Sequence, residues 1–315
     1  MRRSGAKKEY VLGIDGGATK SVAALADMNG KIVVLKRGES INIHSIGEAR
    51  TRKHLKELLS SFIRKYPVRG AVFGLAGLNT KKDETVYRNL IKKILPSRVR
   101  FAVYNDTKIA LEATCGGAGA RILIVSGTGS NVYGEYRGKQ VRAGGWDFLL
   151  GDEGSAYEFG MKAIRAAIRS YDGRGRKTIL ENLVLKKAGV STIPVLIDTI
   201  YAIWHKRPNE LKYYIASFSS LVDTAFAKGD PLAAAIQKDA AEELFLGARA
   251  VIKKLHMGKT RVCVGYAGSN FKAPLLKSLL TRKIKKIAPR AYFVSTIKPV
   301  EGAVLLALKL LGAGR

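Results

Sequence analysis

A glycine-rich turn that follows an apolar run occurs twice in this chain of 315 residues. The first turn reads Asp15-Gly16-Gly17-Ala18-Thr19-Lys20, and the second reads Ser126-Gly127-Thr128-Gly129-Ser130. Each is followed by a second apolar run, an Asn-Gly or Arg-Gly pair and a third short run. The pattern predicts a strand–turn–strand–turn–strand unit that is used once in each half of the chain.

Both glycine turns suit the binding of phosphate. Glycine lets the backbone approach a ligand closely, and consecutive turn N–H groups form a concave site for anionic oxygens. Thr19 and Lys20 could contact phosphate oxygens, and Asp15 could hold Mg²⁺ through water. The alternative is an ordinary hairpin in which Asp15 caps the turn. Because the hairpin is duplicated, we favour the phosphate interpretation.

Helical and strand-like patterns alternate after each hairpin. We expect helices at 48–64 and 83–95, the latter capped by Asp83, with strands at 71–76 and 101–104. In the second half we expect helices at 153–171, 177–187, 194–205, 210–227, 231–256, 271–287 and 300–311, with strands at 261–265 and 291–295. This order predicts two α/β domains around a central cleft. We place their boundaries at 1–114 plus 300–315 and at 115–299.

The chain is strongly basic, with 55 Lys and Arg against 25 Asp and Glu and a net charge of +30. These residues are spread along the whole chain and match no nucleic-acid-binding motif, so we expect no specific nucleic-acid partner. No apolar run reaches the roughly 20 residues that a membrane helix needs, and the basic start lacks the apolar core of a secretory signal. We therefore expect a cytoplasmic protein that does not contact membranes.

Two acidic segments could carry chemistry. Asp106 ends a strand and precedes a helix, where it could accept a proton from a substrate hydroxyl or simply cap the helix. The segment 144–157 combines paired glycines, Trp146 and the carboxylates of Asp152 and Glu153 before a helix. Carboxylates bind sugar hydroxyls well because each offers two acceptor oxygens. A capped helix with an acidic first turn is the alternative, but it leaves the glycines unexplained.

Several motifs together resemble the N-acetylglucosamine kinase and archaeal hexokinase group within the BadF/BadG/BcrA/BcrD-type actin-like ATPases. They are Asp-Gly-Gly-x-Thr-Lys, Ala-Gly-Leu, Asn-Asp, Ser-Gly-Thr-Gly-Ser-Asn, Gly-Gly-Trp, Gly-Asp-Glu-Gly-Ser-Ala-Tyr and Gly-Ala-x-Leu-Leu-Ala, in that order along nearly the whole chain. The resemblance implies the actin-like, ribonuclease H-like fold. It also implies an ATP-dependent kinase that uses Mg²⁺ to phosphorylate a hexose or N-acetylhexosamine, most simply at the 6-hydroxyl. We also expect a homodimer.

The resemblance assigns a role to each motif. Asp106 would be the catalytic base, and Asp15 would hold Mg²⁺ through water. The nucleotide would bind Asp15, Gly16, Gly17, Thr19, Lys20, Gly127, Thr128, Gly129, Ser130, Gly265, Gly268 and Asn270. The sugar would bind Asn42, Asn105, Asp106, Gly145, Trp146, Asp152 and Glu153. One departure concerns Asp147, which replaces the small residue often found after Gly-Gly-Trp, beside the sugar-binding residues. A second is that 265–269 reads Gly-Tyr-Ala-Gly-Ser instead of a simpler Gly-Gly pair.

Two other functions compete with a sugar kinase. A related activator ATPase would drive electron transfer into a dehydratase or benzoyl-CoA-reductase partner and would hold an iron–sulfur cluster between subunits. Cys115 and Cys263 are the two cysteines of the sequence and are poorly placed for such a cluster. A non-catalytic nucleic-acid binder would explain the charge but neither the glycine hairpins nor the acidic segments.

Overall fold

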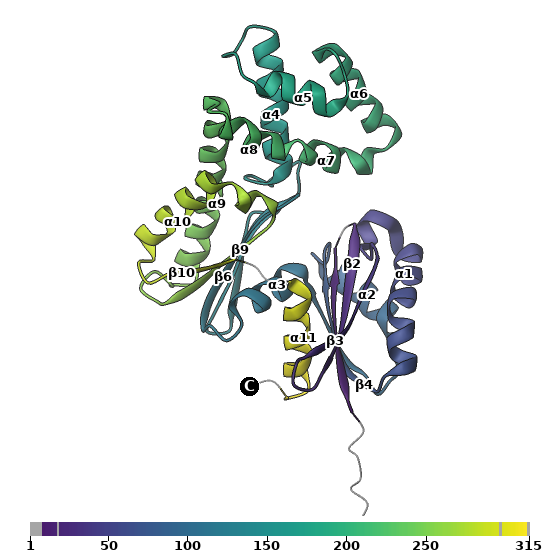
Figure 1. Ribbon diagram of the computed structural model, residues 1–315. Coiled ribbons are helices and arrows are strands. Elements are labelled where there is room, and N and C mark those ends of the chain that lie inside the picture. The colour runs from purple at the N-terminus through teal and green to yellow at the C-terminus, as the bar shows by residue number, and fades with distance from the viewer. Residues whose placement is uncertain (1–7, 18, 296–297, 314–315) are drawn as a thin grey trace, which may run out of the picture. The chain divides into compact units, whose positions relative to one another are not determined.

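The computed structural model describes residues 8–17, 19–295 and 298–313 (Figure 1). The first seven residues of the predicted basic tail therefore lie outside the described part. The chain divides into two compact units. The first holds the described residues of Met1–Gly117 and Thr296–Arg315, and the second holds Ala118–Ser295. No helix of the described residues is long and apolar enough to cross a membrane.

The first unit contains a five-stranded sheet of order β3-β2-β1-β4-β5. Its strands are β1 (Tyr10–Gly16), β2 (Lys20–Asp27), β3 (Ile32–Glu39), β4 (Val68–Leu75) and β5 (Arg100–Asn105). β1 pairs antiparallel with β2, and β2 pairs antiparallel with β3. On its other edge β1 pairs parallel with β4, which pairs parallel with β5.

Helices cover both faces of this sheet. Side chains of β1 alternate between the faces, as expected for a strand. Leu12 and Ile14 join the apolar cluster of α1 (Ile43–Lys65) and α2 (Lys81–Lys92), whereas Val11 joins that of α3 (Asp106–Cys115) and α11 (Pro299–Leu310). Gly302 of α11 lets two helices touch, because a Cβ at this position would lie 1.9 Å from the backbone oxygen of Ile109 in α3.

The second unit repeats the topology of the first. β6 (Ala120–Ser126), β7 (Ser130–Tyr136), β8 (Lys139–Ala143), β9 (Val262–Ala267) and β10 (Tyr292–Ser295) form a sheet of order β10-β9-β6-β7-β8. β6, β7 and β8 are antiparallel neighbours, and β9 and β10 run parallel to β6. The predicted strand–turn–strand–turn–strand unit in each half is therefore confirmed.

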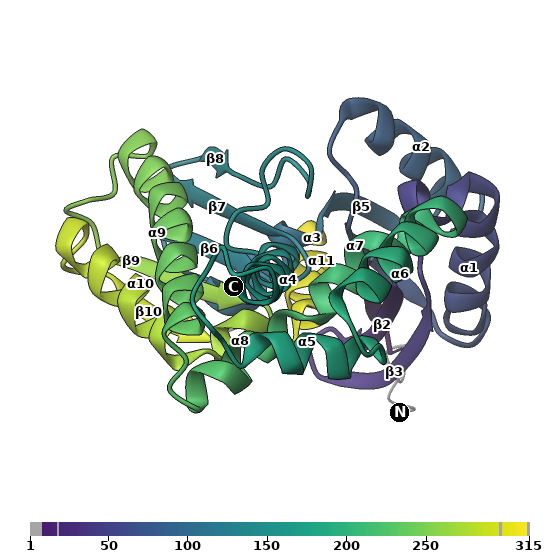
Figure 2. The ribbon, with the colours of Figure 1, turned by 90° about the horizontal axis from the view of Figure 1, so that it is seen from above.

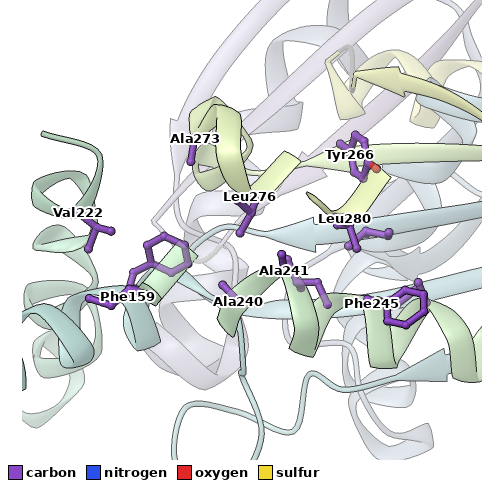
Figure 3. Close-up of a cluster of buried hydrophobic side chains, with 14 of the residues drawn as sticks. Phe159, Val222, Ala240, Ala241, Phe245, Tyr266, Ala273, Leu276 and Leu280 are labelled. Carbon is purple, nitrogen blue, oxygen red and sulfur yellow. The ribbon is translucent and has the colours of Figure 1, made fainter. Parts of the chain in front are cut away.

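The second unit is enlarged by helices between β8 and β9 (Figure 2). These are α4 (Ala156–Tyr171), α5 (Leu180–Ala188), α6 (Ile193–Lys206), α7 (Pro208–Ser217), α8 (Ser219–Ala227) and α9 (Pro231–Lys254). A short 3₁₀ turn at Ser269–Lys272 and α10 (Pro274–Ile287) separate β9 from β10. Figure 3 shows how Phe159 of α4, Phe245 of α9 and Leu280 of α10 contribute to one apolar cluster.

Several helix boundaries differ from the sequence-based expectation; α1, for example, begins at Ile43 and not at residue 48. Thr80, not Asp83, caps α2, and Asp83 completes a capping box from inside the first turn. The helix expected from 153 begins at Ala156, because Ser155 caps it. The single helix expected at 210–227 is two helices that meet at Phe218. The 3.6-residue apolar period continues across that junction, so the pattern could not reveal it.

Candidate functional site

Asp15 and Asp106 lie at the carboxyl ends of strands in the first unit. In the parallel part of the sheet, Gly16 pairs with Leu75 of β4, and Leu75 pairs with Asn105 of β5. Asp15 thus stands one residue before the end of β1, and Asp106 follows the end of β5 as the first residue of α3. Ligands of α/β proteins gather at this edge of a sheet. The structure brings the expected base and the expected metal-binding carboxylate to one edge.

Burial raises the pKa of both carboxyl groups. Burial, followed by the nearby charge of Asp106, raises the pKa of Asp15 to about 6, and Lys20 opposes this change. Burial also raises the pKa of Asp106, against hydrogen bonds from Thr107 that favour its charged form. A raised pKa lies closer to the pKa of an effective general base, which is near the pH at which the enzyme works. A bound cation or a proton would relieve the repulsion between the two carboxylates.

The turn of the first hairpin leaves polar side chains free for a ligand. The Gly17 N–H donates to the Lys20 carbonyl at 3.0 Å, which closes the turn. Gly16 is buried against Ile41 and Leu75, where a Cβ would lie within 3.0 Å of both side chains. Thr19 and Lys20 are exposed. A phosphate group could therefore reach their side chains without disturbing the fold.

Asn42 and Asn105, expected to bind the sugar, flank one loop of the first unit. Asn42 caps α1 by accepting from the His44 N–H at 2.9 Å, and a Cβ on Gly77 would lie 2.7 Å from its Oδ1. Asn105 caps α3 and donates its Nδ2 to the Leu78 carbonyl at 3.1 Å. Both side chains thus have structural partners. Gly77, in the Ala-Gly-Leu motif, was not among the expected site residues although it lies between them.

The second hairpin is fixed by hydrogen bonds to neighbouring loops. Ser126 Oγ donates to the Gly154 carbonyl at 2.6 Å, and Ser130 Oγ donates to the Glu153 carbonyl at 2.6 Å. The Ser130 N–H donates to Asp152 Oδ1 at 3.3 Å. The hairpin therefore lies against the Gly-Asp-Glu-Gly segment, as the two neighbouring motifs of the sequence require if they serve one site.

The loop after β9 touches the same hairpin. Asn270 is buried and donates from Nδ2 to Ser126 Oγ at 3.1 Å. A Cβ on Gly268, whose φ is +111°, would lie 2.2 Å from the Ser126 carbonyl oxygen. Gly265 differs from both, because it lies inside β9 between β6 and β10. Of the expected nucleotide-binding residues in this region, Gly268 and Asn270 lie beside the second hairpin and Gly265 lies in the sheet.

A compact loop precedes Asp152. Gly144 and Gly145 have φ angles of +70° and +72°, and the N–H groups of Gly145 and Trp146 both donate to the Gly151 carbonyl at 3.0 Å. Trp146 is 64% exposed, with the Arg142 guanidinium 4.6 Å from its ring centroid. The loop thus presents an aromatic face next to the buried carboxylate of Asp152, a combination that suits a sugar ring and its hydroxyls.

Asn131 and Lys212 also lie near this loop, and of the two only Lys212 was not expected from the sequence. Asn131 Oδ1 is buried and accepts no hydrogen bond from the described residues, although Asn131 belongs to the Ser-Gly-Thr-Gly-Ser-Asn motif. Lys212 of α7 lies 2.9 Å from Asp152 through its Nζ. The Ser-Gly-Thr-Gly-Ser-Asn motif includes Asn131, but no local signal marks Lys212, which lies 60 residues from Asp152 along the chain.

The described residues offer no cluster of three or more His, Cys, Asp or Glu side chains that could hold a metal ion. Asp15 alone could supply one oxygen ligand from the first hairpin. Mg²⁺ commonly binds through one or two carboxylates, substrate phosphates and water. The donors of this chain fit that manner of binding and do not fit a metal held by protein ligands alone.

Known proteins resemble this chain over most of its length. Residues 12–307 match the model of the BadF/BadG/BcrA/BcrD ATPase family. An N-acetylmuramic acid/N-acetylglucosamine kinase of Clostridium acetobutylicum is 36% identical over 82% of this chain and 85% of its own length. An N-acetyl-D-glucosamine kinase of Dictyostelium discoideum is 31% identical over 96% of this chain and 98% of its own length.

The fold is also found among solved structures. A crystal structure from Chromobacterium violaceum matches with a TM-score of 0.74, covering 96% of this chain and 99% of that chain, at 22% identity. At this identity the likeness shows the fold alone. The expected α/β fold of the actin-like sugar kinases is thereby confirmed.

Proposed function

The chain belongs to the BadF/BadG/BcrA/BcrD ATPase family, and we propose that it is an ATP-dependent sugar kinase. The acceptor is a hexose or an N-acetylhexosamine, and the hydroxyl that receives the phosphoryl group is the one on C6. The observation that carries this proposal is the position of Asp106. It is a carboxylate of raised pKa at the same sheet edge as the first glycine hairpin.

Asp106 acts as the general base in this proposal. Its carboxylate accepts the proton of the sugar hydroxyl while the hydroxyl oxygen attacks the γ-phosphorus of ATP. The bond between that phosphorus and its bridging oxygen breaks, and ADP leaves. Asn105 caps α3 and so fixes the start of the helix on which Asp106 stands. The backbone at this position is therefore set before the sugar binds.

The two hairpins bind the phosphates of ATP. In the first, Gly16 and Gly17 shape the turn while Thr19 and Lys20 supply a hydroxyl and a positive charge. In the second, Thr128 and Gly129 supply backbone N–H groups and a hydroxyl. Gly127 and Ser130 shape the turn, because their N–H groups donate to the Gly129 carbonyl and to Asp152 Oδ1. Asp15 is the residue that would hold Mg²⁺, which neutralises phosphate charge when it is bound. Gly268 and Asn270 support the adenosine end through the loop after β9.

The proposed sugar-binding residues of the first unit are Asn42, Asn105 and Asp106, and those of the second unit are Gly145, Trp146, Asp152 and Glu153. Asp152 is 8% exposed and offers its carboxylate beside the second hairpin. The exposed ring of Trp146 supplies an apolar face. In this proposal the amide and carboxylate groups recognise the sugar hydroxyls.

The activator ATPase is not supported as an alternative. The relatives that match over most of the chain are sugar kinases, as their names state. The homodimer, the cytoplasmic location, the domain limits at 114, 115, 299 and 300 and the absence of a specific nucleic-acid partner stay predictions. Strong binding of nucleic acid that persists at physiological salt would contradict the last of them.

A panel of sugars tests the proposed function. The protein is incubated with ATP, Mg²⁺ and one of glucose, glucosamine, mannose, N-acetylglucosamine or N-acetylmannosamine, and ADP release and the mass of the sugar product are measured. We expect ADP release that depends on the sugar and a product heavier by one phosphoryl group. ADP release at the same rate with and without every sugar would contradict a sugar kinase.

A further inference from the structure

Lys212 joins two carboxylates of the second unit. Its Nζ lies 2.8 Å from Asp147 Oδ1 and 2.9 Å from Asp152 Oδ2. The Lys212 side chain is 23% exposed, that of Asp152 is 6% exposed and that of Asp147 is 67% exposed. Burial opposes the charged form of Lys212, but its hydrogen bonds to Asp147 and Asp152 and their charges outweigh this and raise its pKa. Lys212 is therefore a fully charged cation with two anionic partners.

The backbone holds Asp147 in an unusual conformation. Its φ is +75°, a region that few residues other than glycine adopt, although Asp and Asn do so more readily than most. The N–H groups of Leu150 and Gly151 donate to the Asp147 carbonyl at 3.0 and 2.8 Å. The Phe148 N–H donates to Asp147 Oδ1, the same atom that contacts Lys212. The loop thus directs the Asp147 carboxylate to the lysine.

The cavity beside this group is acidic although the chain is strongly basic. It has a volume of about 370 Å³ and is lined by residues 148–153 and by Tyr157, Glu158, Met161 and Arg165. The charged residues of the lining are Asp152, Glu153 and Glu158 against Arg165. Lys212 would offset one of these carboxylates, but Asp147 cancels its charge. On a chain with a net charge of +30, this local negative charge is an exception.

We propose that Asp147 is a specificity-determining residue that makes the sugar pocket prefer acceptors without a carboxylate. It does so by engaging Lys212, the cation that contacts Asp152, so that no charge of this lysine is left for an anionic group of the acceptor. An acceptor that carries a carboxylate then meets a lining in which three carboxylates outnumber the one cation, Arg165. This inference rests on the proposed function and on Asp152 as a sugar-binding residue.

N-acetylglucosamine and N-acetylmuramic acid form a suitable pair of probes. The two differ by a lactyl ether group, which adds both bulk and a carboxylate. Because the added bulk is the same for every protein variant, a change of their ratio between variants that differ in charge reports on the negative charge. Both sugars appear in the name of the Clostridium acetobutylicum relative. We expect this chain to have a higher kcat/KM for N-acetylglucosamine than for N-acetylmuramic acid.

The test compares the wild-type protein with Asp147→Asn and with the double variant Asp147→Asn, Lys212→Met. Asn tolerates a positive φ and can still accept a hydrogen bond from Lys212, so the first change removes little besides the charge. The quantity measured is the ratio of kcat/KM for N-acetylmuramic acid to that for N-acetylglucosamine. General losses of stability or of ATP binding cancel in this ratio.

Asp147→Asn should raise the ratio about fivefold, because a solvent-exposed charge contributes up to about 1 kcal/mol. Adding Lys212→Met should remove the gain, since the lysine is the group that the substitution releases. An unchanged or lower ratio in Asp147→Asn, or a gain that persists without Lys212, would overturn this inference while the kinase stands. Wild-type protein that phosphorylates no sugar would overturn the proposed function and this inference with it.

Discussion

The β1–β2 hairpin of the first unit and the β6–β7 hairpin of the second occupy the same place in sheets of the same strand order. β1 ends at Gly16 and β6 ends at Ser126, and three residues separate each from the next strand. Asp15 and Lys20 flank the first turn, whereas Val125 and Ser130 take the corresponding positions in the second. Charged residues therefore flank the turn of the first hairpin, and uncharged residues flank the turn of the second.

The two hairpins also differ in how strongly their turns are bonded to the rest of the protein. The polar side chains of the first turn, Thr19 and Lys20, are exposed. The second hairpin has its flanking serines, Ser126 and Ser130, hydrogen-bonded to the segment before α4, and Asn270 adds a third link. The comparison teaches that one topology can present charge in one copy and a rigid backbone in the other. We therefore expect substitutions in the first unit to lower activity and substitutions around the second hairpin to lower stability.

The largest effect is expected from Asp106→Asn in the first unit. The amide keeps the shape of the side chain but cannot accept the proton, so kcat should fall by about 10²–10⁴-fold. The affinity for ATP should persist, because the hairpins remain intact. Steady-state kinetics with N-acetylglucosamine and calorimetric titration with an ATP analogue measure the two quantities. Turnover at the wild-type rate would remove Asp106 from the mechanism.

Gly268→Ala tests how the loop after β9 supports the second hairpin. The new methyl would meet the Ser126 carbonyl in a backbone region that alanine avoids, so the free energy of unfolding should fall by about 3 kcal/mol. Gly229→Ala is the matched control. Gly229 also has a positive φ of 81°, but a Cβ at this position would meet no atom of the described residues within 4 Å. Its loss should be about 1 kcal/mol, from backbone strain alone.

Chemical or thermal unfolding of the two glycine variants gives the comparison. The affinity of Gly268→Ala for an ATP analogue should also fall, since the displaced backbone belongs to the second hairpin. If the two variants lose the same stability and bind the analogue equally well, close packing of Gly268 on Ser126 does not support that hairpin.

A smaller effect is expected from the influence of pH on nucleotide binding at the first hairpin. The pKa of Asp15 is about 6, so its carboxylate is ionised at pH 7 and largely protonated at pH 5. When the pH is lowered from 7 to 5, the affinity for an ATP analogue with Mg²⁺ should therefore fall in the wild-type protein. This fall should be about tenfold larger than in the Asp15→Asn variant, in which residue 15 does not titrate. Identical pH profiles of the two proteins would show that Asp15 does not contribute.

The same group has an effect of opposite sign on stability. Because the pKa of Asp15 is raised on folding, the folded protein favours the protonated form, and stability from this group is lost as pH rises from about 4 to about 6. Asp15→Asn should remove that part of the pH dependence. Thermal unfolding without nucleotide at several pH values measures it.

The sequence predicted the repeated unit because its signal is local. The glycine turns, the short apolar runs and the Asn-Gly and Arg-Gly turns all lie within about 35 residues of one another in each half. Asp106 could likewise be predicted, because strand ends before helices are recognisable. The break at Phe218 could not be predicted, since the apolar period runs through it. Lys212 could not be linked to Asp147 and Asp152, because only the tertiary fold brings α7 to that loop.

Nucleotide binding by paired hairpin variants tests the central claim most directly. Thr19 and Thr128 are exposed residues of the first and second turns, so Thr19→Ala and Thr128→Ala should leave the fold intact. Titration of each variant with an ATP analogue and Mg²⁺ should show weaker binding than in the wild-type protein for both, with the affinity for the sugar retained. Wild-type nucleotide affinity in either variant would contradict the claim that both hairpins bind the phosphates of ATP.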